Sequence, residues 1–156
     1  MREFDYFEMR VPSKTQYVGI TRLAISGLAN RIGFSYDDIE DIKIASSEAI
    51  TNAIQHAYPE AEQGEVVVGC AIYTDKIEIM IADYGKSFDF EEVREKVGPY
   101  DEETNAEFIR EGGLGLFLIE SLMDEVKVLN DNGVTVFMTK YVAREQVKEH
   151  VETDTF

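Results

Sequence analysis

Cysteine, tryptophan and proline are scarce in this chain, which holds one, none and three of them. The single cysteine, Cys70, cannot form an internal disulfide, so the sequence gives no sign of a secreted fold held by disulfides. No apolar run approaches the ~20 residues of a membrane-spanning helix, and the N-terminal residues lack the apolar stretch of a signal peptide. We therefore expect a cytoplasmic protein.

Basic residues are also in short supply, with 15 lysines and arginines against 31 aspartates and glutamates in 156 residues. The net charge of -16 argues against direct binding of DNA or RNA, because a basic surface supplies most of that affinity. The charge fits two interpretations, a surface suited to solubility or a partner that is basic. The length is that of one ordinary domain.

Hydrophobic spacing in the first third of the chain predicts a strand and two helices. The strand covers Phe4 to Val11, and Ser13 is the expected cap of a helix that Gly33 ends. Ser35 is the expected cap of the second helix, which Tyr58-Pro59 should end. The expected apolar faces are Tyr17, Ile20, Leu23, Ala24, Leu28 and Ile32 for the first helix, and Ile39, Ile42, Ala45, Ala49, Ala53 and Ala57 for the second.

Strand patterns dominate the rest of the chain, with hairpin turns expected at Thr74-Asp75 and Asn132-Gly133. The predicted strands are Glu65–Ile72, Lys76–Ala82, Glu125–Leu129 and Val134–Tyr141, and the predicted helices are Phe90–Val97 and Leu114–Met123. This order predicts an α+β two-layer sandwich, in which a mixed, mainly antiparallel sheet carries helices on one face. We expect this domain to cover residues 1–143 and a polar tail to cover residues 144–156.

One polar pattern lies on the second predicted helix, where Glu48, Asn52 and His56 recur every four residues and so line one stripe. A carboxylate can take a proton from a hydroxyl, and an amide oxygen can bind magnesium. The same spacing also fits an ordinary helix with polar residues on one side. His56 alone is more typical of a structural histidine.

Two further patterns follow a strand and precede a helix. Asp83-Tyr84-Gly85 comes directly after a predicted strand, so Asp83 could accept a hydrogen bond from a ligand, or simply start a turn. Gly112, Gly113 and Gly115 stand at the entry of the last helix. Backbone N–H groups there can bind a phosphate, although glycines at a helix entry can also serve flexibility alone.

Taken in this order, the three patterns resemble the GHKL superfamily of ATPases and kinases. Glu48-xxx-Asn52-Ala53-xx-His56 is similar to its N box, Asp83-x-Gly85 to its first glycine box, and Gly112-Gly113-Leu114-Gly115-Leu116 to its second. Thr135 matches the threonine that commonly supports the adenine-binding aspartate. Ser87 is a departure, because many members have a further glycine there. The resemblance implies the GHKL, or Bergerat-type, ATP-binding fold.

Longer stretches resemble one branch of that superfamily, the anti-sigma-B serine-protein kinases of Gram-positive bacteria. The resemblance runs from about Tyr6 to Tyr141 and is clearest at Tyr17–Ile20, Ser47–Tyr58, Ser87–Phe90 and Met123–Val126. The sporulation anti-sigma-F kinases share the same boxes and are the nearest alternative.

The resemblance implies a role for each matched residue. Glu48 would be the general base for an incoming serine, and Asn52 would ligate Mg²⁺ between the phosphates of ATP. Asp83 would accept a hydrogen bond from the adenine amino group, with Thr135 behind it through water. The stretch from Lys86 to Glu111 would be the lid over the nucleotide. The other residues expected to bind ATP are Gly85, Arg110, Gly112, Gly113, Leu114 and Gly115.

The resemblance also implies a homodimer that sequesters a sigma-B-type stress-response sigma factor and phosphorylates a serine on an anti-anti-sigma antagonist protein. Two other functions stay open. One is a pure sigma-factor clamp, which would not need a base at Glu48. The other is a detached histidine-kinase ATPase domain, which would need a phosphoacceptor histidine on a dimerisation helix. The chain has two histidines, His56 and His150.

Overall fold

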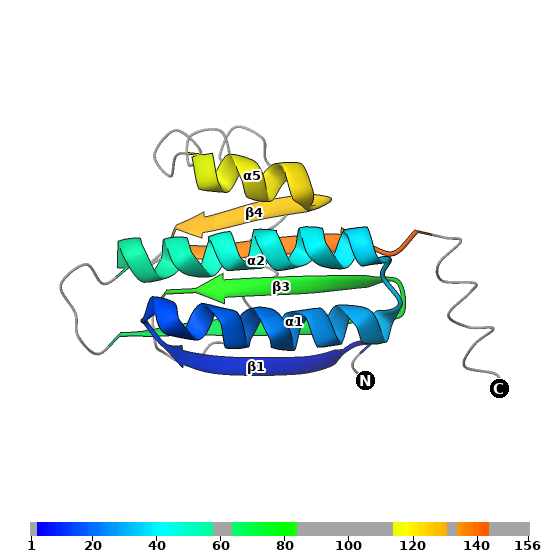
Figure 1. Cartoon of the computed structure of the whole chain (residues 1–156), viewed down its shortest axis with the longest axis horizontal. Helices are drawn as coiled ribbons and strands as arrows, with labels where there is room; N and C mark the ends of the chain where they lie inside the picture. Colours follow the sequence, from blue (N-terminus) through cyan, green and yellow to red (C-terminus); the bar gives the residue numbers. More distant parts are fainter. Residues whose placement is uncertain (1–2, 58–63, 84–113, 131–133, 144–156) are drawn as a thin grey trace.

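The computed structural model describes residues 3–57, 64–83, 114–130 and 134–143. In chain order, its elements are β1 (Asp5–Pro12), the 3₁₀ turn η1 (Thr15–Tyr17), α1 (Val18–Ile32), α2 (Tyr36–Ala57), β2 (Glu65–Ile72), β3 (Lys76–Ala82), α5 (Leu114–Leu122), β4 (Glu125–Asn130) and β5 (Val134–Tyr141) (Figure 1). No helix in these described ranges is long and apolar enough to cross a membrane.

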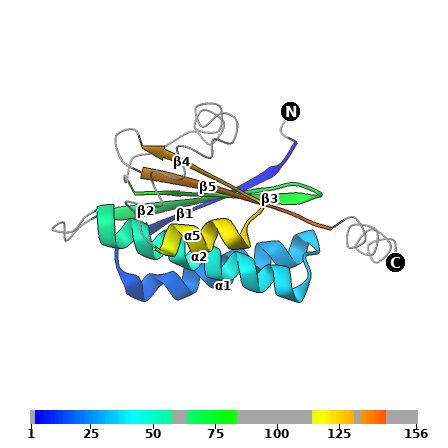
Figure 2. The ribbon, with the colours of Figure 1, turned by 90° about the horizontal axis from the view of Figure 1, so that it is seen from above.

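The five described strands form one sheet in the order β1-β2-β3-β5-β4, and every neighbouring pair is antiparallel. The three helices cover one face of this sheet (Figure 2). The predicted α+β two-layer fold is therefore confirmed. The parallel pairs that a mixed sheet would contain do not occur among the described strands.

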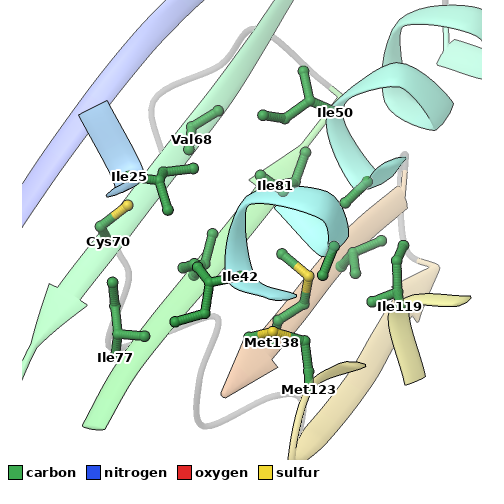
Figure 3. Packing of buried hydrophobic residues seen from close by; sticks show 14 of the residues in the cluster. Ile25, Ile42, Ile50, Val68, Cys70, Ile77, Ile81, Ile119, Met123 and Met138 are labelled. Carbon is green, nitrogen blue, oxygen red and sulfur yellow. The ribbon is translucent and has the colours of Figure 1, made fainter. Parts of the chain in front are cut away.

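The core fills the space between the helices and the sheet. Ile77, Ile79 and Ile81 point from the central strand β3 toward the helices because successive strand residues alternate between the two faces. They meet Ile42 of α2 and Ile119 of α5 in one continuous cluster (Figure 3). This packing fixes the positions of α2 and α5 above the strands.

Cys70 belongs to the same cluster, on β2 and beside Val68 (Figure 3). Its burial penalises the thiolate and raises the pKa of the thiol to about 12. Cys70 is therefore a neutral thiol at pH 7 and behaves as a small apolar core residue, not as a nucleophile.

The sequence predicts Ser13 and Ser35 as the N-caps of the first two helices, and the structure confirms Ser35. The backbone N–H of Asp38 donates to Ser35 Oγ at 3.2 Å, so Ser35 caps α2 as predicted. Ser13 does not cap α1, because η1 intervenes and the N-cap residue of α1 is Tyr17. Gly33 ends α1 as expected, with a left-handed φ of 108° that glycine adopts without strain.

The apolar face predicted for α1 is right at Ile32, which is buried, and at Leu28, which packs against the core, but wrong at Ile20 and Leu23. The residues that α1 buries are Val18, Thr21, Ile25, Ala29 and Ile32. Ile20 and Leu23, which were expected to be buried, are 64% and 68% exposed. Large apolar residues stand on both the buried and the exposed side of α1, so spacing alone does not separate the two sides. Thr21 is tolerated inside because its hydroxyl donates to the carbonyl of Tyr17 at 3.1 Å.

The apolar face predicted for α2 is largely right. Ile42, Ala45 and Ala49 are buried as expected, and Ile39 and Ala53 pack at the edge of the core. Sequence reasoning missed Ile50 and Ile54, which are buried too. The other expected features, a helix at 90–97, the turn at 132–133, the end of α2 at 58–59 and the tail at 144–156, lie outside the described residues.

Ile42 and Ile44 offer a matched test of this core, since they are the same residue on the same helix. Ile42 is fully buried, whereas Ile44 is 44% exposed. We expect Ile42→Ala to lower the free energy of unfolding by ~2–5 kcal/mol, because it leaves a cavity between α2 and the sheet. Ile44→Ala should cost well below ~2 kcal/mol. Urea unfolding of both variants measures the difference, and equal losses would contradict this packing.

Candidate functional site

The helix α2 carries the first part of the candidate site. Glu48 and Asn52 are both half-buried and stand one helical turn apart. α2 packs against α1 on one side and α5 on the other, so this stripe lies within the helix layer. His56 lies in the last turn of α2, and its side chain falls outside what the structure describes.

The second part is the end of strand β3. Asp83 follows the last strand residue, Ala82, and is only 7% exposed. A carboxylate buried to this degree needs polar partners, because removing a charge from water is costly. Its place at a strand end, beside the helix layer, makes Asp83 a candidate for contact with a polar ligand.

Thr135 is close to Asp83 in the sheet, but its side chain stands on the face of the sheet away from the helices. In the register of β3 with β5, Thr135 pairs with Ala82 and Phe137 pairs with Met80. Met80 and Phe137 belong to a small cluster on the face away from the helices. Because side chains two residues apart in a strand share a face, Thr135 is on that face too, where it is 1% exposed. The support that the resemblance expects Thr135 to give Asp83 stays a prediction.

The start of helix α5 is the third part. Leu114 and Gly115 form its first residues, as the glycine-rich helix entry predicted. The other residues expected to bind nucleotide, namely Gly85, Arg110, Gly112 and Gly113, lie outside the described residues, as does the expected lid from Lys86 to Glu111.

These parts meet at one end of the molecule (Figure 1). The last turns of α2, the arrowhead of β3, the beginning of β5 and the beginning of α5 all lie at the left in that view. Asn52, Asp83 and Leu114 therefore belong to one end of the two-layer fold, although they are far apart in sequence, and Glu48 lies one turn of α2 nearer the middle. A carboxylate, an amide, a buried carboxylate and a helix N-terminus suit a ligand with both a hydrogen-bonding ring and anionic groups.

The opposite end is held by a lysine that sequence reasoning missed. Lys140 of β5 is 9% exposed, and its Nζ donates to the carbonyl oxygen of Leu122 at 2.6 Å. The same Nζ lies 3.8 Å from Asp38 Oδ1 and 3.8 Å from Asp41 Oδ2. One ammonium thus joins the first turns of α2 to the C-terminal end of α5, where a cation is favourable.

A signal for Lys140 was present in the strand pattern. Residues in and just after β5 alternate between the two faces of the sheet. The positions that face the helices are Val136, Met138, Lys140 and Val142, so Lys140 points toward the helices. A lysine at an inward position needs acidic or carbonyl partners, and the first turns of α2 supply two aspartates. Asp38 and Asp41 therefore pair with Lys140 as well as favouring the positive N-terminal end of α2.

We expect Lys140→Met to lower the free energy of unfolding by about 1–3 kcal/mol, because it leaves the Leu122 carbonyl without its donor and two carboxylates without their cation. Lys43→Met is the matched control, since Lys43 pairs with Glu40 on the surface of α2 and such pairs contribute about 0–1 kcal/mol. Guanidinium unfolding of both variants gives the comparison. A Lys140 variant as stable as the Lys43 variant would mean that this ammonium does not tie the helices together.

Comparison with known proteins adds to this geometry. The sequence pattern of the family described as "Histidine kinase-like ATPase domain" matches residues 11–140. A protein of Oceanobacillus iheyensis named serine-protein kinase RsbW is 58% identical over 147 residues, which cover 94% of this chain and 93% of that protein. Proteins of the same name from Bacillus cereus strain Q1 and Bacillus anthracis strain CDC 684 are 54% and 53% identical over 148 residues, 95% of this chain and 92% of theirs.

Proposed function

The chain belongs to the histidine kinase-like ATPase domain family and, within it, to the serine-protein kinases of the RsbW type, and from this premise we propose that it is an ATP-dependent anti-sigma factor. It holds a sigma-B-type sigma factor inactive and phosphorylates a serine on the antagonist protein that would otherwise release that factor. The observation that carries the proposal is the convergence of Glu48, Asn52, Asp83 and the start of α5 at one end of the fold.

The residues at this end fit Mg²⁺ and ATP. Asn52 offers an amide oxygen, the kind of hard ligand that Mg²⁺ takes when it is bound mainly through phosphates. Asp83 offers a buried acceptor for the adenine amino group, and the helix dipole at the start of α5 favours phosphate. Thr135 pairs with Ala82, next to Asp83, and is 1% exposed, and in this proposal it supports Asp83 through water as the resemblance implies.

Glu48 performs the proton transfer in this proposal. When bound, ATP supplies the phosphoryl group, and Mg²⁺ offsets the charge of its phosphates. The Glu48 carboxylate would accept the proton of the serine hydroxyl as the serine oxygen forms a bond to the γ-phosphorus and the bond from that phosphorus to the departing ADP breaks. Asn52, one turn further along α2, would hold Mg²⁺ and so help to orient the phosphates. The helix α2 therefore sets the distance between the base and the transferred group.

The cellular role follows from the family. We propose that the protein acts in the cytoplasm as a homodimer, regulating transcription in a stress response, with the sigma factor and the antagonist as its two protein partners. A pure clamp is the second candidate function, because a nucleotide site alone could control sigma-factor binding. The half-buried Glu48 beside Asn52 favours the kinase, since a clamp does not need a proton acceptor there.

Asp83→Asn tests the adenine contact. The amide replaces one acceptor oxygen by an NH₂ group that faces the donor on adenine, so we expect ATP affinity to fall by ~10-fold or more. Asp75→Asn is the matched control and should leave the affinity nearly unchanged, because Asp75 is exposed and stands just before β3, at the other end of that strand. Calorimetric titration with Mg-ATP measures both. Normal affinity in the Asp83 variant, or an equal loss in the Asp75 variant, would remove the adenine role.

Glu48→Gln tests the chemistry. The substitution keeps the size of the side chain and removes the proton acceptor, so single-turnover phosphorylation of the antagonist should slow by ~10²–10⁴-fold. ATP binding and sigma-factor binding should persist, because neither needs proton transfer. Glu40→Gln, on the same helix near its start, is the control and should be as fast as the wild type. A Glu48 variant that transfers phosphate at nearly the normal rate would make Glu48 structural and return the clamp to consideration.

A further inference from the structure

The strand β1 is the outermost strand on one side of the sheet (Figure 1). It pairs with β2 over its eight residues, and no described strand lies along its other side. The side chains of Phe7, Glu8 and Arg10 are exposed, Phe7 by 50%. β4 forms the opposite edge of the sheet, but it is shorter and its described side chains are buried or half-buried. A long, accessible edge strand presents backbone groups with which another strand can pair.

The ladder between β1 and β2 fixes which residues present backbone groups at the free edge of β1. Successive residues of a strand direct their N–H and C=O groups to opposite sides. The N–H of Ser13 donates to the carbonyl of Gly64 at 2.9 Å, in the register that continues the ladder, so residues at odd positions face β2. The residues whose backbone groups face the free edge are Tyr6, Glu8, Arg10 and Pro12, and Pro12 has no N–H to leave unpaired there.

The Tyr6 ring leans inward over the sheet and not across the free edge. A Cβ added to Gly69 of β2 would lie 2.5 Å from the Tyr6 hydroxyl oxygen and 3.2 Å from its Cε1, so the ring occupies the space that a side chain at position 69 would need. The Tyr6 hydroxyl donates to Glu8 Oε1 at 3.3 Å. The ring therefore leaves the edge accessible and helps to hold the Glu8 carboxylate in place beside it.

The charges on β1 select one way in which the strand can pair with a second copy of itself. A two-fold axis through Met9 sets Glu8 opposite Arg10 of the second copy, and Arg10 opposite Glu8 of the second copy. Both residues present N–H and C=O groups to the free edge, so each pair can exchange backbone hydrogen bonds. An axis through Glu8 would set that carboxylate opposite its own copy, where like charges repel. An axis through Phe7 would set Arg10 opposite a position before Asp5, beyond the end of the strand.

The same axis pairs side chains usefully on both faces of the sheet. Phe7 and Val11 share the face of Met9, which packs against the main core, and the axis sets Phe7 opposite Val11 of the second copy. Pairing thus covers a ring that the single chain leaves half exposed. On the other face, Arg10 already lies 3.7 Å from Glu65 of its own chain. In the pair, its guanidinium would stand between that carboxylate and Glu8 of the second copy.

We propose that β1 pairs antiparallel with β1 of a second copy of this chain, about a two-fold axis at Met9, and so joins the two sheets into one. Such an interface is isologous and closes with two subunits. Charges on an edge strand usually prevent pairing, but Glu8 and Arg10 are complementary in this register. A stable interface covers roughly 800 Å² on each partner, so the strand pair is the central contact within a wider one. The inference rests on the proposed homodimer and not on the kinase chemistry.

Sedimentation velocity over a range of protein concentrations measures the Kd of the dimer and tests the charge pairs. Glu8→Arg should raise this Kd by ~10-fold or more, because the axis then sets like charges opposite each other at two symmetric places. Arg10→Glu should do the same. The two substitutions combined restore opposite charges, so the double variant should return to within about fivefold of the wild type. Lys127→Glu, a charge reversal on the other edge strand β4, is the matched control and should leave Kd unchanged.

A cross-link locates the axis. Met9 would stand opposite its own copy in a pair without backbone hydrogen bonds, where the Cα atoms are ~4.5 Å apart and within reach of a disulfide. Met9→Cys should therefore form an intermolecular disulfide under mild oxidation. Phe7→Cys is the matched control and should not, because Phe7 faces Val11 of the second copy and lies ~13 Å from the second Phe7. The native Cys70 does not interfere, since its pKa of about 12 keeps it a neutral thiol.

The outcomes distinguish this inference from the proposed function. A wild-type protein that stays monomeric would overturn the homodimer and this interface together. A wild-type dimer that Glu8→Arg leaves intact, or that the double variant fails to restore, would overturn the pairing of β1 while the homodimer stands. Equal cross-linking of the Met9 and Phe7 variants would overturn the axis at Met9. Restored dimerisation in the double variant, with cross-linking at Met9 alone, supports the proposal, because a misfolded single variant would not be rescued by a second charge reversal.

Discussion

The buried cluster between the helices and the sheet sets where the helix layer sits, and the ammonium of Lys140 ties two of its helices together at one end. It joins the carbonyl of Leu122, at the end of α5, to Asp38 and Asp41 in the first turns of α2. The last turns of α2 and the start of α5 lie at the opposite end of the fold. One end is thus held by a buried ammonium, and the other carries the polar residues of the candidate site.

The three helices differ in which of their faces are buried and in what they contribute to the candidate site. α2 is packed between its neighbours and contributes the half-buried stripe that carries chemistry. The beginning of α5 lies at the same end of the fold as the last turns of α2, and a helix N-terminus favours anions. α1 covers the sheet with one face and leaves Ile20 and Leu23 exposed on the other.

Sequence reasoning succeeded where two independent signals agreed. The strands Glu65–Ile72, Lys76–Ala82 and Val134–Tyr141 were placed at their observed bounds because alternation and turn residues coincide there. It failed where one signal fitted two answers. Large apolar residues stand on both sides of α1, so the exposed Ile20 looks buried in the sequence, and Ser13 resembles a cap although η1 intervenes.

The most direct test of the account is to follow the fate of the γ-phosphate. The purified protein, Mg²⁺, ATP labelled on the γ-phosphate and the antagonist are incubated together, and the products are separated before and after treatment with acid. The account predicts label on a serine of the antagonist, which withstands acid, and none on the protein itself. Label released only as inorganic phosphate, or held on a histidine and lost in acid, would contradict a serine-protein kinase built on Glu48 and Asn52.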